Sequence, residues 1–146
     1  KPNVLALDSN LAYQYLLSGE AKAAFLFTSQ AVVCEQSMPG AFEYVFPSEG
    51  IGFGIDAMVI PASAENPEGA NAFLNYLMRP EVAATIQPWT MYLNVNAAAA
   101  ELLPEGSLDY AALNIPEDLF ATKQFAEDLG DYESVYQEIW SEFKLS

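Results

Sequence analysis

Hydrophobic and polar positions in the first third of the chain follow two different spacings. The apolar residues of segment 11–16 fall on one face of a helix, with Asp8 at the start and Gly19 at the end. Residues 23–27 and 42–46 are short apolar runs typical of buried strands, and polar residues 28–30 between them can open a second helix through about residue 37. This order of helix, strand, helix and strand favours an α/β layered sheet, in which ligands bind beyond the carboxyl ends of strands.

The middle of the chain carries strong helix start signals. Asn66 followed by Pro67 and Glu68 predicts a helix through residue 78, and Pro80 predicts a break followed by a second helix over residues 82–87. We expect Pro88 to end that helix. Alternation then predicts an extended segment over residues 89–95, and Asn96 predicts a cap for a helix over residues 97–103.

The last third is weakly patterned until its end. Residues 104–116 predict a loop that contains one short helix starting at Ser107. Residues 131–144 place six apolar side chains at the spacing of one helix face, so we expect an amphipathic helix with that face packed in the core.

Residues 50–61 combine three alternating glycines with an apolar strand that a single acid interrupts. Gly50, Gly52 and Gly54 allow the backbone to bend or to approach another surface closely, and residues 57–60 have the character of a buried strand. A carboxylate at Asp56, between solvent and core, requires a partner. Two interpretations stay open at this point: a turn carboxylate satisfied by backbone amides, or a carboxylate that meets a ligand.

Charge and composition exclude several functions. The 146 residues carry a formal net charge of −15, with five basic residues and no histidine, so the chain lacks the basic surface that nucleic acids or anionic membranes require. The absence of histidine removes the Ser-His-Asp triad and His-ligated metals, the glycines do not form a dinucleotide fingerprint, and no calcium loop is present. These absences remove the commonest hydrolase and zinc arrangements without forbidding catalysis, and we expect no metal and no cofactor. An acid-catalysed hydrolase is the weakest alternative, because no two carboxylates are fixed together by the pattern.

No apolar run reaches the roughly 18 residues of a membrane span, and the single cysteine, Cys34, excludes an intramolecular disulfide. Cys34 lies in an apolar run, where we expect a small core residue. The acidic surface would concentrate cations near the protein and speed their arrival, although acidity alone also keeps proteins soluble.

Three stretches together resemble the C-terminal half of the solute-binding proteins of ABC importers, specifically the spermidine/putrescine-binding group. They are LSGEAKAAF at 17–25, EG at 49–50 with Phe53 and IDAMVIP at 55–61, and NPEGA at 66–70 through LMRPEVA at 77–83, followed by Tyr92, Asn96, Gly130 and Tyr136. Their order and spacing cover nearly the whole chain.

The resemblance implies an α/β fold, part of a two-lobed type II periplasmic binding protein with three-layer α/β/α lobes. It places residues 1–54 in the second lobe, residues 55–102 across the hinge and in part of the first lobe, and residues 103–146 in a C-terminal helical return to the second lobe. A receptor of this group is more than twice as long as this chain, so the chain resembles a fragment.

Residue by residue, the resemblance implies a polyamine site. Phe27 matches an aromatic position of the cleft, Asp56 matches the acid that meets a ligand ammonium, and Tyr92 matches a cleft tyrosine. The chemistry agrees, because aromatic faces and carboxylates bind chains of methylenes and protonated amines. Two positions depart from the group: Gly54 stands where a tryptophan is usual, and Ala126 falls where a polar contact is usual. The first departure leaves room for another small cationic ligand, and Phe27 and Tyr92 have packing roles as their alternative.

As a function, the resemblance implies the substrate-binding component of an ABC transporter that imports polyamines. It implies an extracytoplasmic location, in the periplasm or on the outer face of the cell membrane, lipid-anchored or fused to its permease, with a membrane permease as partner. The alternative is a ligand-free interaction or assembly fragment. A truncated sheet exposes edges and apolar faces, so such a fragment is expected to form a homodimer.

Overall fold

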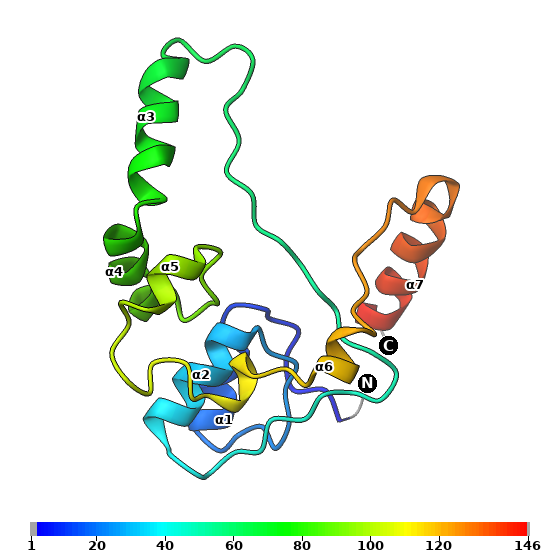
Figure 1. The fold of residues 1–146 in the computed structure, drawn as a ribbon. Coiled ribbons are helices and arrows are strands. Elements are labelled where there is room, and N and C mark those ends of the chain that lie inside the picture. Colours follow the sequence, from blue (N-terminus) through cyan, green and yellow to red (C-terminus); the bar gives the residue numbers. More distant parts are fainter. Residues whose placement is uncertain (1–2, 146) are drawn as a thin grey trace.

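The computed structural model describes residues 3–145 as seven α-helices and two 3-10 helices joined by irregular segments (Figure 1). In chain order they are α1 (Ala12–Leu17), α2 (Thr28–Ser37), α3 (Pro67–Leu77), α4 (Pro80–Thr90), α5 (Ala97–Ala100), η1 (Ala111–Leu113), α6 (Glu117–Phe120), η2 (Gly130–Tyr132) and α7 (Glu133–Leu145). Two helix groups can be distinguished by their packing. The first helix group contains α1, α2 and η1, and the second contains α3, α4 and α5.

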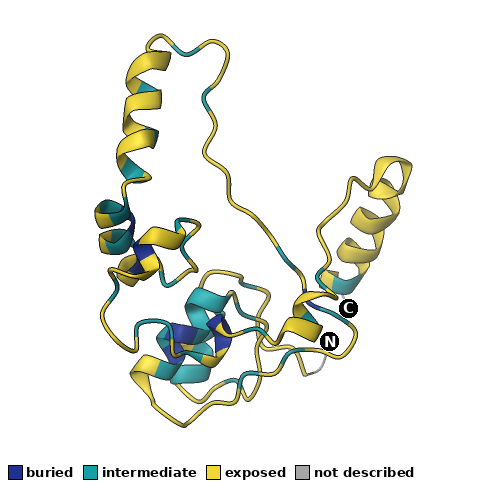
Figure 2. Cartoon of the chain, in the orientation of Figure 1, coloured by how far each residue is buried: buried dark blue, intermediate teal, exposed yellow. Residues whose placement is uncertain are grey.

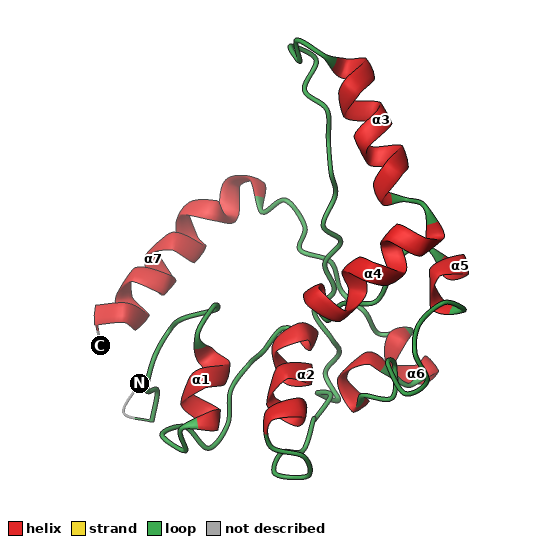
Figure 3. Ribbon diagram, turned by 90° about the vertical axis from the view of Figure 1, so that its left-hand side faces the viewer, coloured by secondary structure: helices red, strands yellow, loops and turns green. Residues whose placement is uncertain are grey.

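The expected α/β sheet is not confirmed, because residues 3–145 contain no strand (Figure 3). The segments predicted as strands, residues 23–27, 42–46 and 57–60, are irregular. Strands are held by hydrogen bonds to a neighbouring strand, and none of the described segments supplies such a neighbour to them. One isolated parallel bridge joins Gly52 to Gln124.

The helix starts that the sequence predicts from capping and proline residues are found in the structure. The Asn66 side chain accepts a hydrogen bond from the Gly69 N–H at 2.9 Å, and Pro67 is the first residue of α3. The break at Pro80 and the cap by Asn96, whose side chain accepts the Ala98 N–H at 3.1 Å, are likewise confirmed. These signals succeed because each is satisfied within one turn of chain.

The Asn66 cap leads to a testable prediction. Asn66→Ala removes the acceptor for the Gly69 N–H, so we expect a loss of about 1 kcal/mol in the stability of α3, visible as faster amide exchange across Pro67–Leu77. Asn71→Ala is the control, because Asn71 lies inside the same helix, where alanine is the better helix former. Equal loss of protection in both variants would show that the cap has no special role.

Three predicted helix boundaries are wrong. Helix α4 continues past Pro88 to Thr90, since a proline in the last turn removes only one hydrogen bond, and the prediction of an extended segment from residue 89 fails with it. The helix ends at Met91, whose φ of 59° is left-handed. Helix α5 stops at Ala100 rather than at residue 103, and the short helix expected from Ser107 is η1, which begins at Ala111.

Helix α7 forms where it was predicted, but its apolar face is not in the core. Tyr132 is 71% exposed and Ile139 is 60% exposed, and no residue of α7 is buried (Figure 2). Among the described elements, the main packing partner of α7 is η2, which directly precedes it in the chain. The amphipathic pattern predicts which face of the helix is apolar. It does not predict which part of the protein, or which partner, packs on that face.

Among the described residues, the buried apolar side chains form one small cluster, and further buried residues lie elsewhere. Val32, Ala112 and Leu113 join α2 to η1, with Tyr44 and Met91 packed against them. Ala83 of α4 and Ala99 of α5 are buried in the second helix group. The cluster therefore connects chain segments that lie about 80 residues apart, as Val32 and Leu113 do.

Cys34 is buried as expected, with 2% of its surface exposed. Burial raises the pKa of its thiol, so the reactive thiolate fraction at any given pH is lower than in an unfolded chain. We expect a disulfide reagent to modify Cys34 at least about tenfold more slowly in the native chain than in guanidinium chloride at the same pH. Equal rates would show that the first helix group opens readily in solution.

Candidate functional site

Asp56 lies on the long connection that runs from the first helix group to α3 (Figure 1). The residue is exposed, and it makes no hydrogen bond or ion pair to any residue in the described part of the chain. Its neighbours Ile55 and Met58 are 69% and 63% exposed. A local backbone partner for the carboxylate, which was one of the two interpretations, is therefore absent from residues 3–145.

Phe27 and Tyr92 are placed by the ends of helices. Phe27 immediately precedes α2, and its carbonyl oxygen accepts hydrogen bonds from the N–H groups of Gln30 and Ala31. Its ring is 56% exposed. Tyr92 follows the left-handed residue that ends α4 and is 41% exposed. Neither aromatic ring is a core residue in this structure.

No hydrogen bond, ion pair or ring contact within residues 3–145 brings Asp56, Phe27 and Tyr92 together. They belong to three different segments: the connection, the start of α2 and the end of α4. Their joint role in one cleft stays a prediction.

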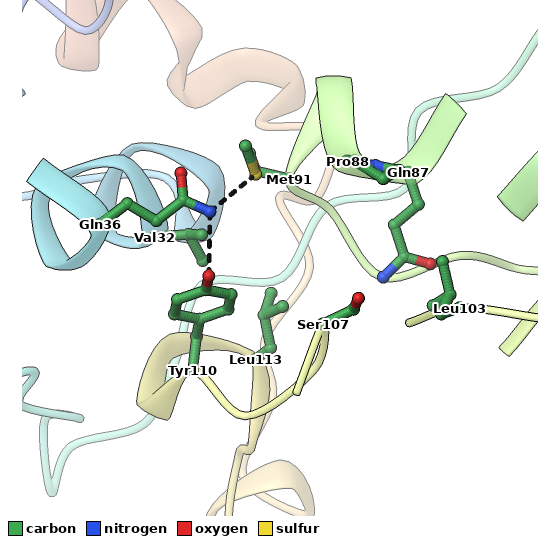
Figure 4. A pocket seen from close by; sticks show the side chains of 9 residues that line it. All are labelled: Val32, Gln36, Gln87, Pro88, Met91, Leu103, Ser107, Tyr110 and Leu113. Atoms are coloured by element: carbon green, nitrogen blue, oxygen red, sulfur yellow. Dashed lines mark hydrogen bonds between the residues drawn. The ribbon is translucent and has the colours of Figure 1, made fainter. Parts of the chain in front are cut away.

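A cavity of about 90 Å³ lies where the two helix groups meet (Figure 4). Its lining comes from α2, the end of α4, η1 and the segment between α5 and η1: Val32, Gln36, Gln87, Pro88, Met91, Leu103, Ser107, Tyr110 and Leu113. The Gln36 Nε2 donates to the Tyr110 hydroxyl at 2.9 Å and lies 3.8 Å from the Met91 sulfur. Gln87 is 5% exposed, and its Oε1 has no hydrogen-bond partner among the described residues.

This cavity does not have the chemistry of a site for a cation. No charged side chain lines it, and an ammonium moved from water into a neutral cavity loses hydration without gaining a counter-charge. We interpret the cavity as the joint between the two helix groups.

An aromatic cluster that the sequence patterns did not reveal lies beside the glycine segment. The ring of Phe53 is 5.5 Å from the rings of Phe120 and Phe125, with interplanar angles of 89° and 80°. The Nζ of Lys123 lies 4.4 Å from the centre of the Phe120 ring, a cation–π contact. An open pocket beside the cluster is lined by Lys123, Gln124, Phe125 and Glu127.

The glycine pattern is the sequence feature that indicated a contact beside this aromatic cluster. A side chain at Gly50, whose φ is +123°, would put a Cβ 3.0 Å from the carbonyl oxygen of Thr122. The Phe53 N–H donates to the Gln124 carbonyl at 2.8 Å, and the Gln124 N–H donates to the Ile51 carbonyl at 2.9 Å. Of the two expectations for the glycines, a bend or a close approach, the close approach is found at Gly50, and the surface that it approaches is Thr122 and Gln124, whereas a Cβ at Gly52 or Gly54 would meet nothing within 4 Å.

The described residues contain no group of three or more histidine, cysteine, aspartate or glutamate side chains that could hold a metal ion. None of the helices in residues 3–145 is long and apolar enough to cross a membrane.

The chain belongs to the bacterial extracellular solute-binding protein family, whose sequence profile matches residues 3–114. This match confirms the family expected from the three sequence stretches. The solute-binding family implies the type II periplasmic binding fold, of which the described residues show helices only.

Several characterised proteins are similar to this chain. The spermidine/putrescine-binding periplasmic proteins of Salmonella typhimurium and Escherichia coli are 31% and 30% identical to it over 143 residues, which is 98% of the chain and 41% of each relative. The putrescine-binding periplasmic protein SpuD of Pseudomonas aeruginosa is 48% identical over 63 residues, 43% of this chain and 17% of that protein. The chain thus spans about two fifths of the length of the first two relatives.

Proposed function

We propose that this chain forms part of the substrate-binding component of an ABC transporter that imports polyamines such as spermidine or putrescine. The observation that carries the proposal is the Asp56 carboxylate, exposed and without a partner in residues 3–145, in a chain that belongs to a solute-binding family. The names of the relatives and the net charge of −15 both support a cationic ligand. On this proposal the protein works outside the cytoplasm, delivers its ligand to a membrane permease and catalyses no reaction.

The proposed ligand chemistry uses two kinds of contact. Asp56 pairs with a protonated amine through a charge-assisted hydrogen bond, and the faces of Phe27 and Tyr92 cover methylenes and attract the neighbouring charge. The exposure of all three side chains is consistent with this role, because side chains that bind a ligand have to be open to solvent before it arrives.

The proposed lobe boundaries agree with the packing of the helices. Helix α2 packs on η1 and Gly52 pairs with Gln124, so contacts join residues 1–54 to residues 103–146. Helices α3, α4 and α5 pack on one another within residues 55–102. In the three-layer lobes that we propose for the longer protein, the unpaired segments 23–27, 42–46 and 57–60 become strands when their neighbours are supplied.

The test is titration calorimetry of the full natural protein that carries this sequence, with spermidine and putrescine. We expect saturable binding of at least one of them, with an association rate that falls as salt is added. If millimolar polyamine produces no heat and does not compete with other small cations, the polyamine proposal is wrong. Binding of a different cation would instead place the change of specificity at Gly54.

A second candidate function is an assembly fragment that associates as a homodimer. It is favoured by the apolar surface that the structure leaves open: Val59 is 80% exposed on the connection, and Trp140 of α7 is 44% exposed. Extended backbone without ladder partners and apolar faces of this kind promote association with a second copy. Light scattering of the 146-residue chain distinguishes the candidates, since a monomer with one cooperative thermal transition contradicts the assembly fragment.

A further inference from the structure

We propose that Phe53, Phe120 and Phe125 form a wall that binds a ligand ammonium, and that Lys123 occupies this wall when no ligand is present. The inference deepens the proposed function and rests on it for the natural ligand, a polyamine. We call the three rings the aromatic wall.

The geometry of the aromatic wall leaves ring faces open to a ligand. Both ring pairs are near perpendicular, so neither Phe120 nor Phe125 covers its face by stacking on Phe53. Phe120 is 39% exposed and Phe125 is 48% exposed, whereas Phe53 is half-buried between them. Phe53 meets each of the other two rings at nearly a right angle and so forms a corner with each, and an alkylammonium placed in such a corner contacts more than one ring.

The backbone fixes the corner. The two hydrogen bonds around the Gly52–Gln124 bridge hold residues 51–53 against Gln124, one residue before Phe125. Gly50 permits this approach, as its missing Cβ leaves room for the Thr122 carbonyl. The backbone that carries Phe53 is therefore held beside the backbone that leads to Phe125 before any ligand binds, which lowers the entropic cost of binding.

Lys123 places an ammonium on one ring of the wall, where its Nζ also donates a hydrogen bond to the Phe120 carbonyl at 3.5 Å. The chain has only five basic residues, and the Nζ of this one lies 4.4 Å from the Phe120 ring centre. A free alkylammonium carries the same charge on the same kind of apolar stem, so it can make the same contact once Lys123 moves away. Lys123 therefore competes with a ligand ammonium for the Phe120 ring.

Two carboxylates make the exchange favourable for a ligand with several charges. Glu127 lines the pocket that also contains Lys123 and Phe125. Asp56 follows Phe53 by three residues, and three residues of extended chain span at most about 11 Å. A polyamine with one amine on the wall can therefore reach Asp56 with another, which a single lysine ammonium cannot do.

The aromatic wall also accounts for Gly54. The family resemblance places a tryptophan at this position, and the chain has no side chain there. Phe53, beside Gly54, belongs to a corner that offers aromatic surface to the same segment. The wall would take over the contact that the missing ring no longer provides.

The test compares four variants of the natural protein by calorimetry with putrescine. Lys123→Met removes the competitor and keeps an apolar stem, so we expect about two- to fivefold tighter binding. Lys22→Met is the matched control, because it makes the same charge change at a residue outside the wall. Phe125→Leu is expected to weaken binding by a similar factor, and Phe25→Leu, at a ring that is 96% exposed and outside the wall, is expected to leave it unchanged.

The proposal is overturned if Lys123→Met behaves like Lys22→Met and Phe125→Leu behaves like Phe25→Leu. If Asp56→Asn then still weakens binding by about ten- to hundredfold, the polyamine function stands without the wall. A second experiment tests whether the wall binds an ammonium even if the protein does not bind polyamines. Tetramethylammonium is titrated into the natural protein while the ring resonances of Phe53, Phe120 and Phe125 are observed by NMR. Selective shifts of these rings in a protein that does not bind putrescine would support the wall and contradict the polyamine function, and no shifts would contradict the wall.

Discussion

Replacing Asp56 with asparagine is expected to weaken the binding of spermidine or putrescine by about ten- to hundredfold. The variant keeps the size and exposure of the side chain but removes the charge, and a hydrogen bond to a charged group contributes about 1.5–3 kcal/mol. Tyr92→Phe removes only a neutral hydroxyl and keeps the ring, so its effect should be smaller, about tenfold at most. Calorimetric titration of both variants in the natural protein measures the difference.

Glu138→Gln on α7 is the control for the change in net charge, because Glu138 lies outside every segment to which we assign a ligand contact. We expect this variant to bind as the natural protein does, apart from a small change in the association rate. Equal losses for Asp56→Asn and Tyr92→Phe would argue that Asp56 has a structural role only. Equal losses for Asp56→Asn and Glu138→Gln would point to the overall field of the protein instead of a specific pair.

Truncating Leu113 to alanine is expected to cost about 2–5 kcal/mol of the free energy of unfolding. Leu113 is 6% exposed, packs with Val32 and Ala112, and borders the cavity at the joint. The truncation enlarges a cavity that already exists, and α2 cannot close the space without losing its contact with η1. Urea denaturation of the 146-residue chain followed by circular dichroism measures the loss.

Leu145→Ala makes the same chemical change on α7 at a side chain that is 88% exposed, so we expect less than about 0.5 kcal/mol. A similar cost at both positions would contradict the packing of η1 on α2. It would then remove the support that this packing gives to the assignment of residues 1–54 and 103–146 to one lobe.

The sequence predicted the helices well because their signals are local. Asn66, Pro80 and Asn96 each act on backbone groups within one turn, and Gly19, with a φ of +77°, follows the end of α1 as expected. No local signal of this kind determines a strand. The apolar run at residues 23–27 is as typical of a strand as any in the chain, yet a strand exists only where a second one pairs with it.

The candidate site was predictable to the extent that it depends on single residues. The exposed carboxylate of Asp56 was recognised from its unusual place in an apolar run, and the close approach at Gly50 from the glycine pattern. The aromatic wall was not recognised, since Phe53 and Phe120 lie far apart in the sequence and Phe125 falls in a weakly patterned region. Only the backbone contact at Gly52 and Gln124 brings them together.

The two helix groups are connected twice, by residues 38–66 and by residues 101–110. A single tether would leave one group free to rotate about the chain in any direction. A second connection prevents one group from turning freely about the first, so it restricts how the two groups move relative to each other. The cavity lined by Gln87 lies where the groups meet, so its volume would change with any such movement.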